Sequence, residues 1–471
     1  MSHDREVPMK HLYLIRHARA KRATDDHERP LSGRGQRQVA AMAEPLQRLG
    51  AFTGEIHVST ALRARQTLLG LDATLPELGL AARAHYHEAL YTFEEKPLRR
   101  WLRAADLDTD HLTLIGHNPA LLELAQRLSA QAPKRLPTGG LLHITLPIAT
   151  WRELGRHQGE IIHTLSPREA SHILFQGRAP EPPRLDDLGT RHRIINQLEH
   201  QYRMIRALEP GVAAGHDPEF LHQYRVNLRR SRALAETLLA IIEIPRLGRA
   251  LKGLKRHARA TSELRDLEVF LEHLARQPSP EAGPALTPLV AWLHERAREA
   301  RRELCHQLQR RAYARDMLAW RDAIASKGFT KALSGLQERQ IDRVLRERLA
   351  RHDAQLTSLT DASPDAALHK LRKRVKRLRY LAELSPERHR RLLEGLKVHQ
   401  ERLGDFQDLC SQLDWLDAFT DAEPGQALPE TSRQALQHWR TRLHERKATL
   451  RQAILALAPL TERDSAQPTP A

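Results

Sequence analysis

The hydrophobic positions in the first part of the chain form short runs separated by segments of helical length. A short apolar run between turn signals is typical of a buried strand, and strands that alternate with helices favour a layered α/β domain. We therefore predict an α/β domain with a mainly parallel sheet, flanked by helices, over residues 9–175. The predicted strands are residues 12–15, 56–59, 112–115 and 141–146.

The pattern changes after residue 190, where the strand signal disappears and apolar residues recur at helical spacing. It predicts an all-helical domain over residues 191–460. A proline-containing stretch, residues 176–190, is predicted to be a linker. The polar tail, residues 461–471, is predicted to be disordered. Predicted breaks between helices fall at residues 209–211, 278–288, 361–364 and 423–425.

The helical part contains an internal repeat. Residues 222–232 align with residues 369–379, and both segments begin with histidine and carry basic residues at matching positions. Downstream of each segment is an acidic motif, at residues 263–266 and 405–408. Two matches in the same order predict a duplicated helical unit.

In each copy, basic residues recur at spacings of three, four and three, which places them along one face of a helix. We call these faces the two basic ridges. Like charges at this spacing repel by about 0.2–0.5 kcal/mol per pair. A bound polyanion would reduce this repulsion, and so would nearby carboxylates such as Asp266, Asp405 and Asp408. The ridge residues are His222, Arg225, Arg229 and Arg232 in the first copy, and His369, Arg372, Lys376 and Arg379 in the second. Further cations that widen the ridges are Arg230, Lys373, Arg374 and Arg377.

Charge and composition narrow the class of ligand. The net charge of the chain is +17, of which residues 1–176 contribute +4 and the remainder +13. A basic surface attracts polyanions because binding releases their counterions. Aromatic residues make up only 4% of the chain, so platforms for stacking single-stranded bases are scarce and nucleic acid is the less favoured polyanion.

Composition also indicates the compartment. There are two cysteines, Cys305 and Cys410, which excludes a disulfide scaffold and a Cys-rich metal site. The first residues are polar and lack the apolar segment of a signal peptide. No run approaches the roughly 20 apolar residues of a membrane span. We expect a cytoplasmic protein without a membrane partner.

Three of the predicted strands lead directly to histidine or arginine. Residues 12–15 precede Arg16 and His17, residues 56–59 precede Arg63, and residues 112–115 precede His117. The carboxyl ends of parallel strands share one edge of a sheet, where such sheets bind ligands. An arginine fork matches phosphate oxygens. The sequence therefore predicts a phosphate pocket at this edge.

These motifs, together with Arg29-Pro30-Leu31, residues 63–67 and residues 137–140, resemble the histidine phosphatase superfamily and most closely its SixA-like branch. The resemblance implies that His17 is a nucleophile that forms a phosphohistidine intermediate. It also implies that Arg16, Arg63 and His117 hold the phosphoryl oxygens, without a metal or cofactor. Glu88 is the candidate general acid. The implied substrate is a phosphohistidine protein or a small phosphate ester.

The chain departs from this family after the nucleophile, where glycine is usual and Ala18 stands here. Since glycine permits a close backbone approach, Ala18 is expected to narrow the pocket or shift its affinity.

The helical repeat resembles the CHAD domain, the conserved histidine α-helical domain. The similarity covers residues 191–460 and includes both ridges, Arg265-Asp266, Arg379-Tyr380 and residues 403–405. It implies two pseudo-symmetric four-helix units around a basic channel, and inorganic polyphosphate as the ligand.

The leading hypothesis is a phosphatase tethered to polyphosphate, located in the cytoplasm in association with polyphosphate granules. In a variant of it, the bound polyphosphate is itself the substrate, because tethering raises its local concentration at His17. Two alternatives remain: a non-catalytic polyphosphate-binding or scaffold protein with a vestigial phosphatase domain, and a nucleic-acid-associated factor.

Overall fold

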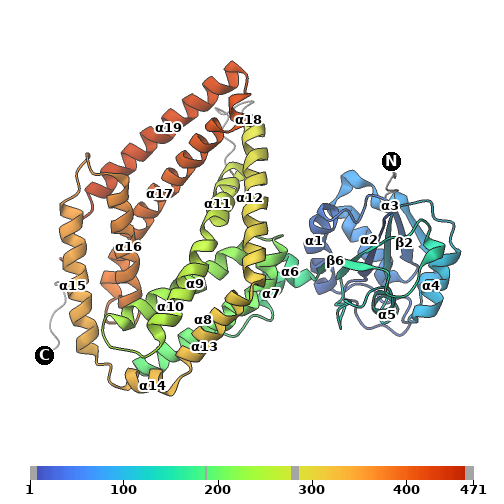
Figure 1. Ribbon diagram of the computed structural model, residues 1–471, viewed down its shortest axis with the longest axis horizontal. Coiled ribbons are helices and arrows are strands. Elements are labelled where there is room, and N and C mark those ends of the chain that lie inside the picture. Colours follow the sequence, from blue (N-terminus) through green and yellow to red (C-terminus); the bar gives the residue numbers. More distant parts are fainter. Residues whose placement is uncertain (1–7, 186–187, 277–285, 462–471) are drawn as a thin grey trace, which may run out of the picture. The chain divides into compact units, whose positions relative to one another are not determined.

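The computed structural model describes residues 8–185, 188–276 and 286–461 (Figure 1). It divides into two compact units. The N-terminal unit comprises residues 1–179 and 210–217, and the helical unit comprises residues 180–209 and 218–471. Residues 462–471 of the predicted tail (461–471) and residues 278–285 of the predicted break (278–288) lie outside the described residues.

The N-terminal unit contains a mixed sheet with strand order β3-β2-β4-β1-β5-β6. Strands β1, β4, β2 and β3 pair in parallel, whereas β5 pairs antiparallel with β1, and β6 pairs antiparallel with β5. The prediction of a mainly parallel sheet is confirmed. The strands are β1 Lys10–Arg16, β2 Glu55–Ser59, β3 Ala84–His87, β4 His111–Gly116, β5 Leu141–Leu146 and β6 Glu160–Leu165.

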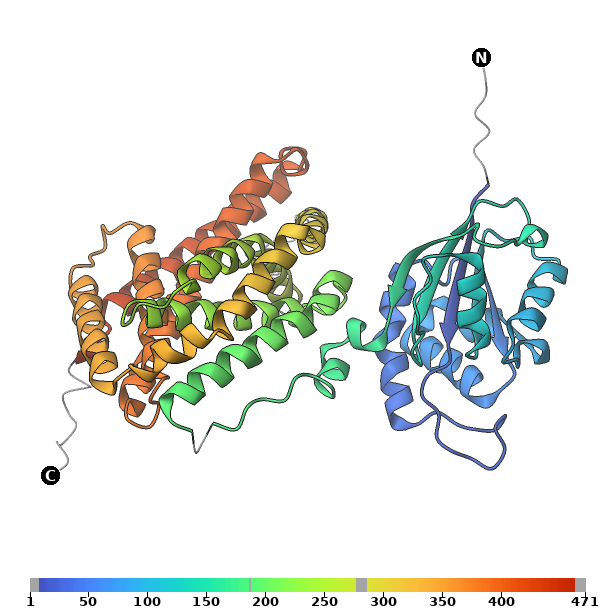
Figure 2. The same cartoon turned by 60° about the horizontal axis from the view of Figure 1, so that its bottom comes forward.

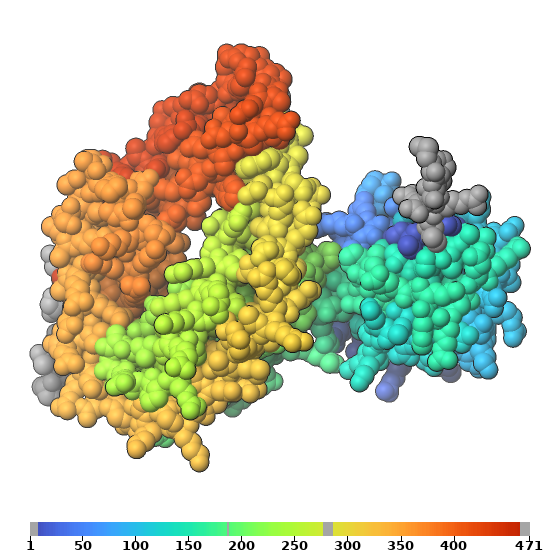
Figure 3. Space-filling model, viewed as in Figure 1, coloured from blue at the N-terminus to red at the C-terminus, as the bar shows by residue number. Residues whose placement is uncertain are grey.

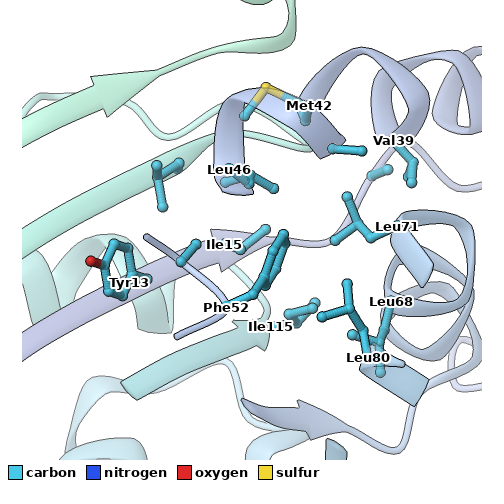
Figure 4. Close-up of a cluster of buried hydrophobic side chains, with 14 of the residues drawn as sticks. Tyr13, Ile15, Val39, Met42, Leu46, Phe52, Leu68, Leu71, Leu80 and Ile115 are labelled. Carbon is cyan, nitrogen blue, oxygen red and sulfur yellow. The ribbon is translucent and has the colours of Figure 1, made fainter. Parts of the chain in front are cut away.

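Helices cover both faces of this sheet (Figure 2). Because successive side chains of a strand point to opposite faces, Tyr13 and Ile15 of β1 face one layer, and Leu12 and Leu14 face the other. The first layer contains helices α1 and α2, and Figure 4 shows part of its buried cluster. The helices of the unit are α1 Gly33–Arg48, α2 Leu62–Thr74, α3 Leu80–Arg83, α4 Glu95–Ala104, α5 Ala120–Leu128, α6 Pro167–Ala170 and α7 His172–Gln176.

The helical unit contains the sequence repeat as two successive sets of helices. The second ridge lies on α16, and the first lies on α9. The long helix α17 follows α16, whereas the first copy has two helices, α10 and α11, separated at Thr261. The last residues of α8, from Pro210 on, are grouped with the N-terminal unit. The helices are α8 Thr190–Ala214, α9 Glu219–Leu239, α10 Leu247–Ala260, α11 Ser262–Arg276, α12 Leu286–Gln309, α13 Arg311–Ile324, α14 Lys327–Ser334, α15 Glu338–Thr357, α16 Asp365–Ala382, α17 Arg390–Asp421, α18 Glu423–Gln426 and α19 Glu430–Leu455.

Three of the predicted helix breaks are wrong in part. Residues 423–425 lie within the short helix α18, and the break falls at Ala422 instead. Helix α8 continues through Pro210, although proline removes one backbone hydrogen bond. Leu208 and Val212 on either side of it are buried, and their packing offsets that loss. Pro288 lies in the first turn of α12, where the backbone N–H has no partner within the helix. The break at 361–364 is confirmed, because α15 ends at Thr357 and α16 begins at Asp365.

Among the described residues, no helix combines the length and the hydropathy needed to cross a lipid bilayer.

Candidate functional site

The backbone around His17 is held by two neighbouring segments. The His17 N–H donates to the carbonyl oxygen of Gly116 at the end of β4, 3.0 Å away. The Gly139 N–H donates to the carbonyl oxygens of Arg16 and His17 at 3.0 and 3.1 Å. Gly139 has a φ of +73°, a conformation that an L side chain rarely adopts, which explains the glycine in this loop. Backbone hydrogen bonds alone therefore fix the position of the end of β1.

The His17 ring has a defined protonation pattern. Its Nδ1 atom lies 2.8 Å from the Ala18 carbonyl oxygen, which only accepts hydrogen bonds, so Nδ1 carries the proton. The Nε2 atom then presents its lone pair, toward which Arg63 Nε–H points at 3.3 Å. Burial, reinforced by the charges of Arg63 and Arg16, lowers the pKa of His17 to about 4. The imidazole is thus neutral at pH 7, and its Nε2 is unprotonated.

Arg63 and His117 complete the surroundings of this ring. The Arg63 side chain is almost wholly buried and is held by Asp26, whose Oδ2 lies 2.9 Å from Nη2. The His117 ring lies 5.1 Å from the His17 ring, and its Nε2 is 2.8 Å from the Ser59 hydroxyl. Burial holds the pKa of His117 far below its usual range, so this ring is neutral too.

Two buried nitrogen atoms at this site, Arg16 Nε and His117 Nδ1, have no hydrogen-bond partner among the described residues. Arg16 also donates from Nη1 to the Leu136 carbonyl oxygen at 2.9 Å, which fixes its guanidinium. Buried polar groups are normally paired, and an oxyanion bound between these side chains would provide the acceptor that Arg16 lacks. The geometry therefore suits a phosphoryl group.

Glu88 is placed differently from the other predicted site residues. Its side chain is 72% exposed, accepts a hydrogen bond from Thr60, and lies 3.8 Å from His27 Nε2. The structure brings Arg16, His17, Arg63 and His117 together, and it leaves Glu88 at the rim.

Asp26 is a site residue that sequence reasoning missed. Its carboxylate accepts hydrogen bonds from Arg29, Arg63 and Tyr91. These hydrogen bonds hold the pKa of the carboxyl well below its usual range, and the one from Arg29 has the largest effect. Its ionised carboxylate fixes the direction of the Arg63 fork. The only signal was its position just before the Arg29-Pro30-Leu31 motif.

The structure does not bear out the expected narrowing of the pocket by Ala18. Ala18 is completely buried and belongs to the hydrophobic cluster between the sheet and helices α1 and α2. Its methyl group therefore packs in the core. Its N–H donates to the Thr67 hydroxyl at 3.0 Å, a further contact that the sequence did not predict.

In the helical unit the two basic ridges face each other. Helices α9 and α16 pack together, and Arg229 Nε donates to the Tyr380 hydroxyl at 2.9 Å. The charges of Arg225, Arg229 and Arg372 all act on Lys376. Cations from both copies therefore meet. In Figure 3, segments of the first copy, green to yellow, and of the second, orange to red, border a common hollow.

Two carboxylates lie within this group of cations. Asp266 of α11 is near Arg225 and Arg372, and Asp408 of α17 is near Arg372 and Lys376. Burial raises the pKa of both carboxyls, while the neighbouring cations oppose that rise. We call these side chains the central cluster: Arg225, Arg229, Asp266, Arg372, Lys376 and Asp408.

The other ridge residues lie around the central cluster. His222 is half-buried near Arg265 and Arg229, and His369 is bonded to Gln407. Arg379 is paired with Glu383 at 2.8 Å, which compensates its charge. Arg230 and Lys373 are exposed. Arg232 is close to Arg377, which instead lines a separate basic pocket with Lys255, Arg348, Arg351 and Arg374.

Residues 196–417 match the family model of the CHAD domain. The chain carries a CHAD domain. The CHAD domain from the plant Ricinus communis has a similar structure, with 22% identity, 59% of this chain and 96% of that chain covered, and a TM-score of 0.47.

The part of the chain outside the CHAD domain has similar structures as well. The SixA structure from Nakamurella multipartitia is 24% identical, covers 34% of this chain and 96% of its own, and has a TM-score of 0.29. A protein histidine phosphatase SixA complexed with tungstate is 23% identical, covers 34% and 99%, and has a TM-score of 0.30.

A curated relative, an uncharacterized protein from a strain of Picosynechococcus, is 35% identical over 127 residues, which is 25% of this chain and 72% of the relative. The chain belongs to the same family as that protein.

The CHAD domain provides a pH-dependent prediction. Burial lowers the pKa of Lys376 to about 7, Arg372, Arg229 and Arg225 lower it as well, and Asp408 opposes the shift. A bound phosphate chain would raise this pKa, so binding above pH 7 takes up a proton. We expect polyphosphate affinity to fall by up to about tenfold per pH unit between pH 7 and 9.

Titration calorimetry in buffers of different ionisation enthalpy measures both the affinity and the proton uptake. The variant Lys376→Arg keeps its charge throughout this range and is expected to lose the pH dependence. An equal dependence in the variant would show that another group is responsible.

Proposed function

We propose that this protein is a metal-independent phosphatase with a histidine nucleophile, tethered to inorganic polyphosphate through its CHAD domain. The observation that carries the first half is the neutral His17 imidazole, which has Nδ1 fixed by the Ala18 carbonyl and Nε2 beside Arg63. The substrate is a phosphohistidine protein or a small phosphate ester.

The proposed reaction gives each of these side chains a role. His17 Nε2 attacks phosphorus and forms a phosphohistidine, which water then hydrolyses. Arg16 and Arg63 neutralise the charge on the phosphoryl oxygens, which is the main demand of phosphoryl transfer. A leaving imidazole needs little help from an acid, in agreement with the exposed position of Glu88.

The second half of the proposal rests on the central cluster. Four cations from α9 and α16 converge there, and Asp266 and Asp408 only partly compensate them. A flexible linear phosphate chain would relieve the remaining repulsion and release its own counterions. A protein bound in this way is expected to co-localise with polyphosphate granules in the cytoplasm.

The direct test is turnover of a radiolabelled phosphate ester by the full chain with a metal chelator present. We expect steady release of phosphate, and an acid-labile label on the protein after rapid quenching. Loss of turnover on chelation would contradict a metal-independent mechanism. Absence of turnover with every phosphate ester and phosphohistidine peptide tried would favour a scaffold protein with a vestigial phosphatase domain.

A further inference from the structure

Arg16, the neighbour of His17, lies in the lining of a basic pocket of about 530 Å³ in the N-terminal unit. It begins at Arg16 and continues along the loop at residues 133–138 to α6 and the segment after α7. We call it the arginine groove. Its lining includes six arginines, Arg16, Arg19, Arg34, Arg135, Arg168 and Arg178.

The charge of this groove is not compensated. Among the described residues, none of the six arginines forms an ion pair. The one carboxylate in the lining, Glu169, accepts from the Ser166 N–H at 2.7 Å and caps the start of α6. Burial lowers the pKa of Arg168, and the charges of Arg178, Arg34 and Arg135 lower it further. The guanidinium groups of these four arginines are therefore close enough to repel one another.

The arginine groove contains more arginines than the binding of a small monophosphate requires. In the proposed function a phosphoryl group on His17 would contact Arg16 and Arg63, which leaves the five remaining groove arginines without a role in holding it. A solvated surface would spread its cations outward, whereas these line a hollow, with Arg16, Arg34 and Arg168 half-buried. None of the described residues that line the groove is aromatic, so this lining offers no stacking platform for nucleobases. Its ligand is an extended anion that is recognised by charge alone.

We infer that the arginine groove binds the chain of a linear inorganic polyphosphate whose terminal phosphoryl group reacts at His17. This rests on the proposed function and names its substrate. His17 Nε2 forms a bond to the terminal phosphorus, and the P–O bond of the anhydride breaks, which leaves the shortened chain as an anion. Water then bonds to phosphorus, and the P–N bond breaks as its electron pair returns to Nε2. One proton of the water stays on orthophosphate and the other goes to solvent.

This chemistry also fits the position of Glu88. The phosphate leaving group of an anhydride is a stable anion at neutral pH, so it departs without a proton. An ordinary alkyl ester would need a general acid near its bridging oxygen, whereas Glu88 is bonded to Thr60 at the rim. The end of a polyphosphate chain is thus a substrate that this site could cleave without a general acid.

The test uses the full chain and three substrates: an aryl phosphate, a linear polyphosphate of defined length, and a phosphohistidine peptide with acidic flanks. The variant Arg34→Ala/Arg168→Ala removes two groove cations that do not touch His17. The variant Arg48→Ala/Arg100→Ala removes two exposed arginines of the same unit and is the charge-matched control. If the first variant unfolds at a lower temperature, Arg19→Ala/Arg135→Ala, which changes exposed groove residues, replaces it.

We expect the wild type and the control to release orthophosphate from polyphosphate. In the groove variant, KM for polyphosphate should rise about tenfold or more, because two charge-assisted hydrogen bonds are lost. Its kcat, and its kinetics with the aryl phosphate, should be unchanged. Repeating the series in a Lys376→Glu background separates capture by the CHAD domain from capture by the groove.

The possible failures are distinguishable. Hydrolysis of the aryl phosphate without hydrolysis of polyphosphate would overturn this inference and leave the proposed function intact. An unchanged KM for polyphosphate in the groove variant would also overturn it. A larger loss with the acidic peptide than with polyphosphate would assign the groove to a phosphoprotein instead. No turnover of any substrate would refute the proposed function itself.

Discussion

Replacing His17 with alanine is expected to lower kcat for an aryl phosphate by on the order of 10⁴-fold or more, because it removes the atom that we propose bonds to phosphorus. Arg16, Arg63 and His117 would remain, but electrostatic stabilisation without a nucleophile retains only a small residual rate. Steady-state assays of the full chain measure the loss, and rapid quenching should show that the covalent label disappears with it.

The His17 side chain is buried, so the variant needs two controls. His85→Ala removes an exposed histidine from the edge strand β3 and should retain full activity. Free imidazole added to His17→Ala could occupy the space of the lost ring and restore part of the turnover. Equal rates for His17→Ala and the wild type would remove His17 from the mechanism.

The charge-reversed double variant Arg229→Glu/Lys376→Glu is expected to weaken polyphosphate binding by about 10²- to 10⁴-fold, since each cation contributes a charge-assisted contact of roughly 1.5–3 kcal/mol. Both residues belong to the central cluster, one on each repeat helix. The slope of affinity against salt concentration should become shallower too, because fewer counterions are released. Fluorescence anisotropy with end-labelled polyphosphate at several salt concentrations measures both effects.

The matched control is Arg311→Glu/Arg346→Glu, which makes the same change of net charge at exposed positions on α13 and α15. A loss of affinity as large in the control would show that binding depends only on total charge. The neutral pair Arg229→Gln/Lys376→Gln tests the same contacts if charge reversal next to Asp266 and Asp408 unfolds the domain. Tighter binding of DNA than of polyphosphate at equal salt would replace the proposed ligand.

The sequence predicted the buried strands well and the edge strands poorly. Strands β1, β4 and β5 are covered on both faces, so they read as continuous apolar runs. Strands β3 and β6 lie at the edges of the sheet, where polar residues such as His85 and His163 are exposed, and no apolar run marks them. Helix α8 shows the opposite error, because burial on both sides of Pro210 overrides the local signal of a proline.

The meeting of Arg16, His17, Arg63 and His117 could be predicted because all four lie at or after the ends of strands in one parallel sheet. A parallel sheet carries the ends of β1, β2 and β4 to one edge, so residues that follow them, such as His17, Arg63 and His117, meet without further information. Asp26 could not be predicted, since a loop carries it to Arg63 across the fold. The arginine groove is assembled from segments far apart in the chain, and no local spacing indicates that their cations share one hollow.

For the two basic ridges, too, the sequence determines one part of the arrangement and the tertiary structure the other. Helical periodicity alone determines that each repeat helix has a face of cations, since residues three and four apart share a face. Only the packing of α9 against α16 decides which of these cations meet: Arg225, Arg229, Arg372 and Lys376 converge on Asp266 and Asp408, whereas Arg379 pairs with Glu383 and Arg377 lines another pocket. The physical reason is that a periodic pattern sets directions within one helix, while contacts between helices depend on how their buried faces pack together.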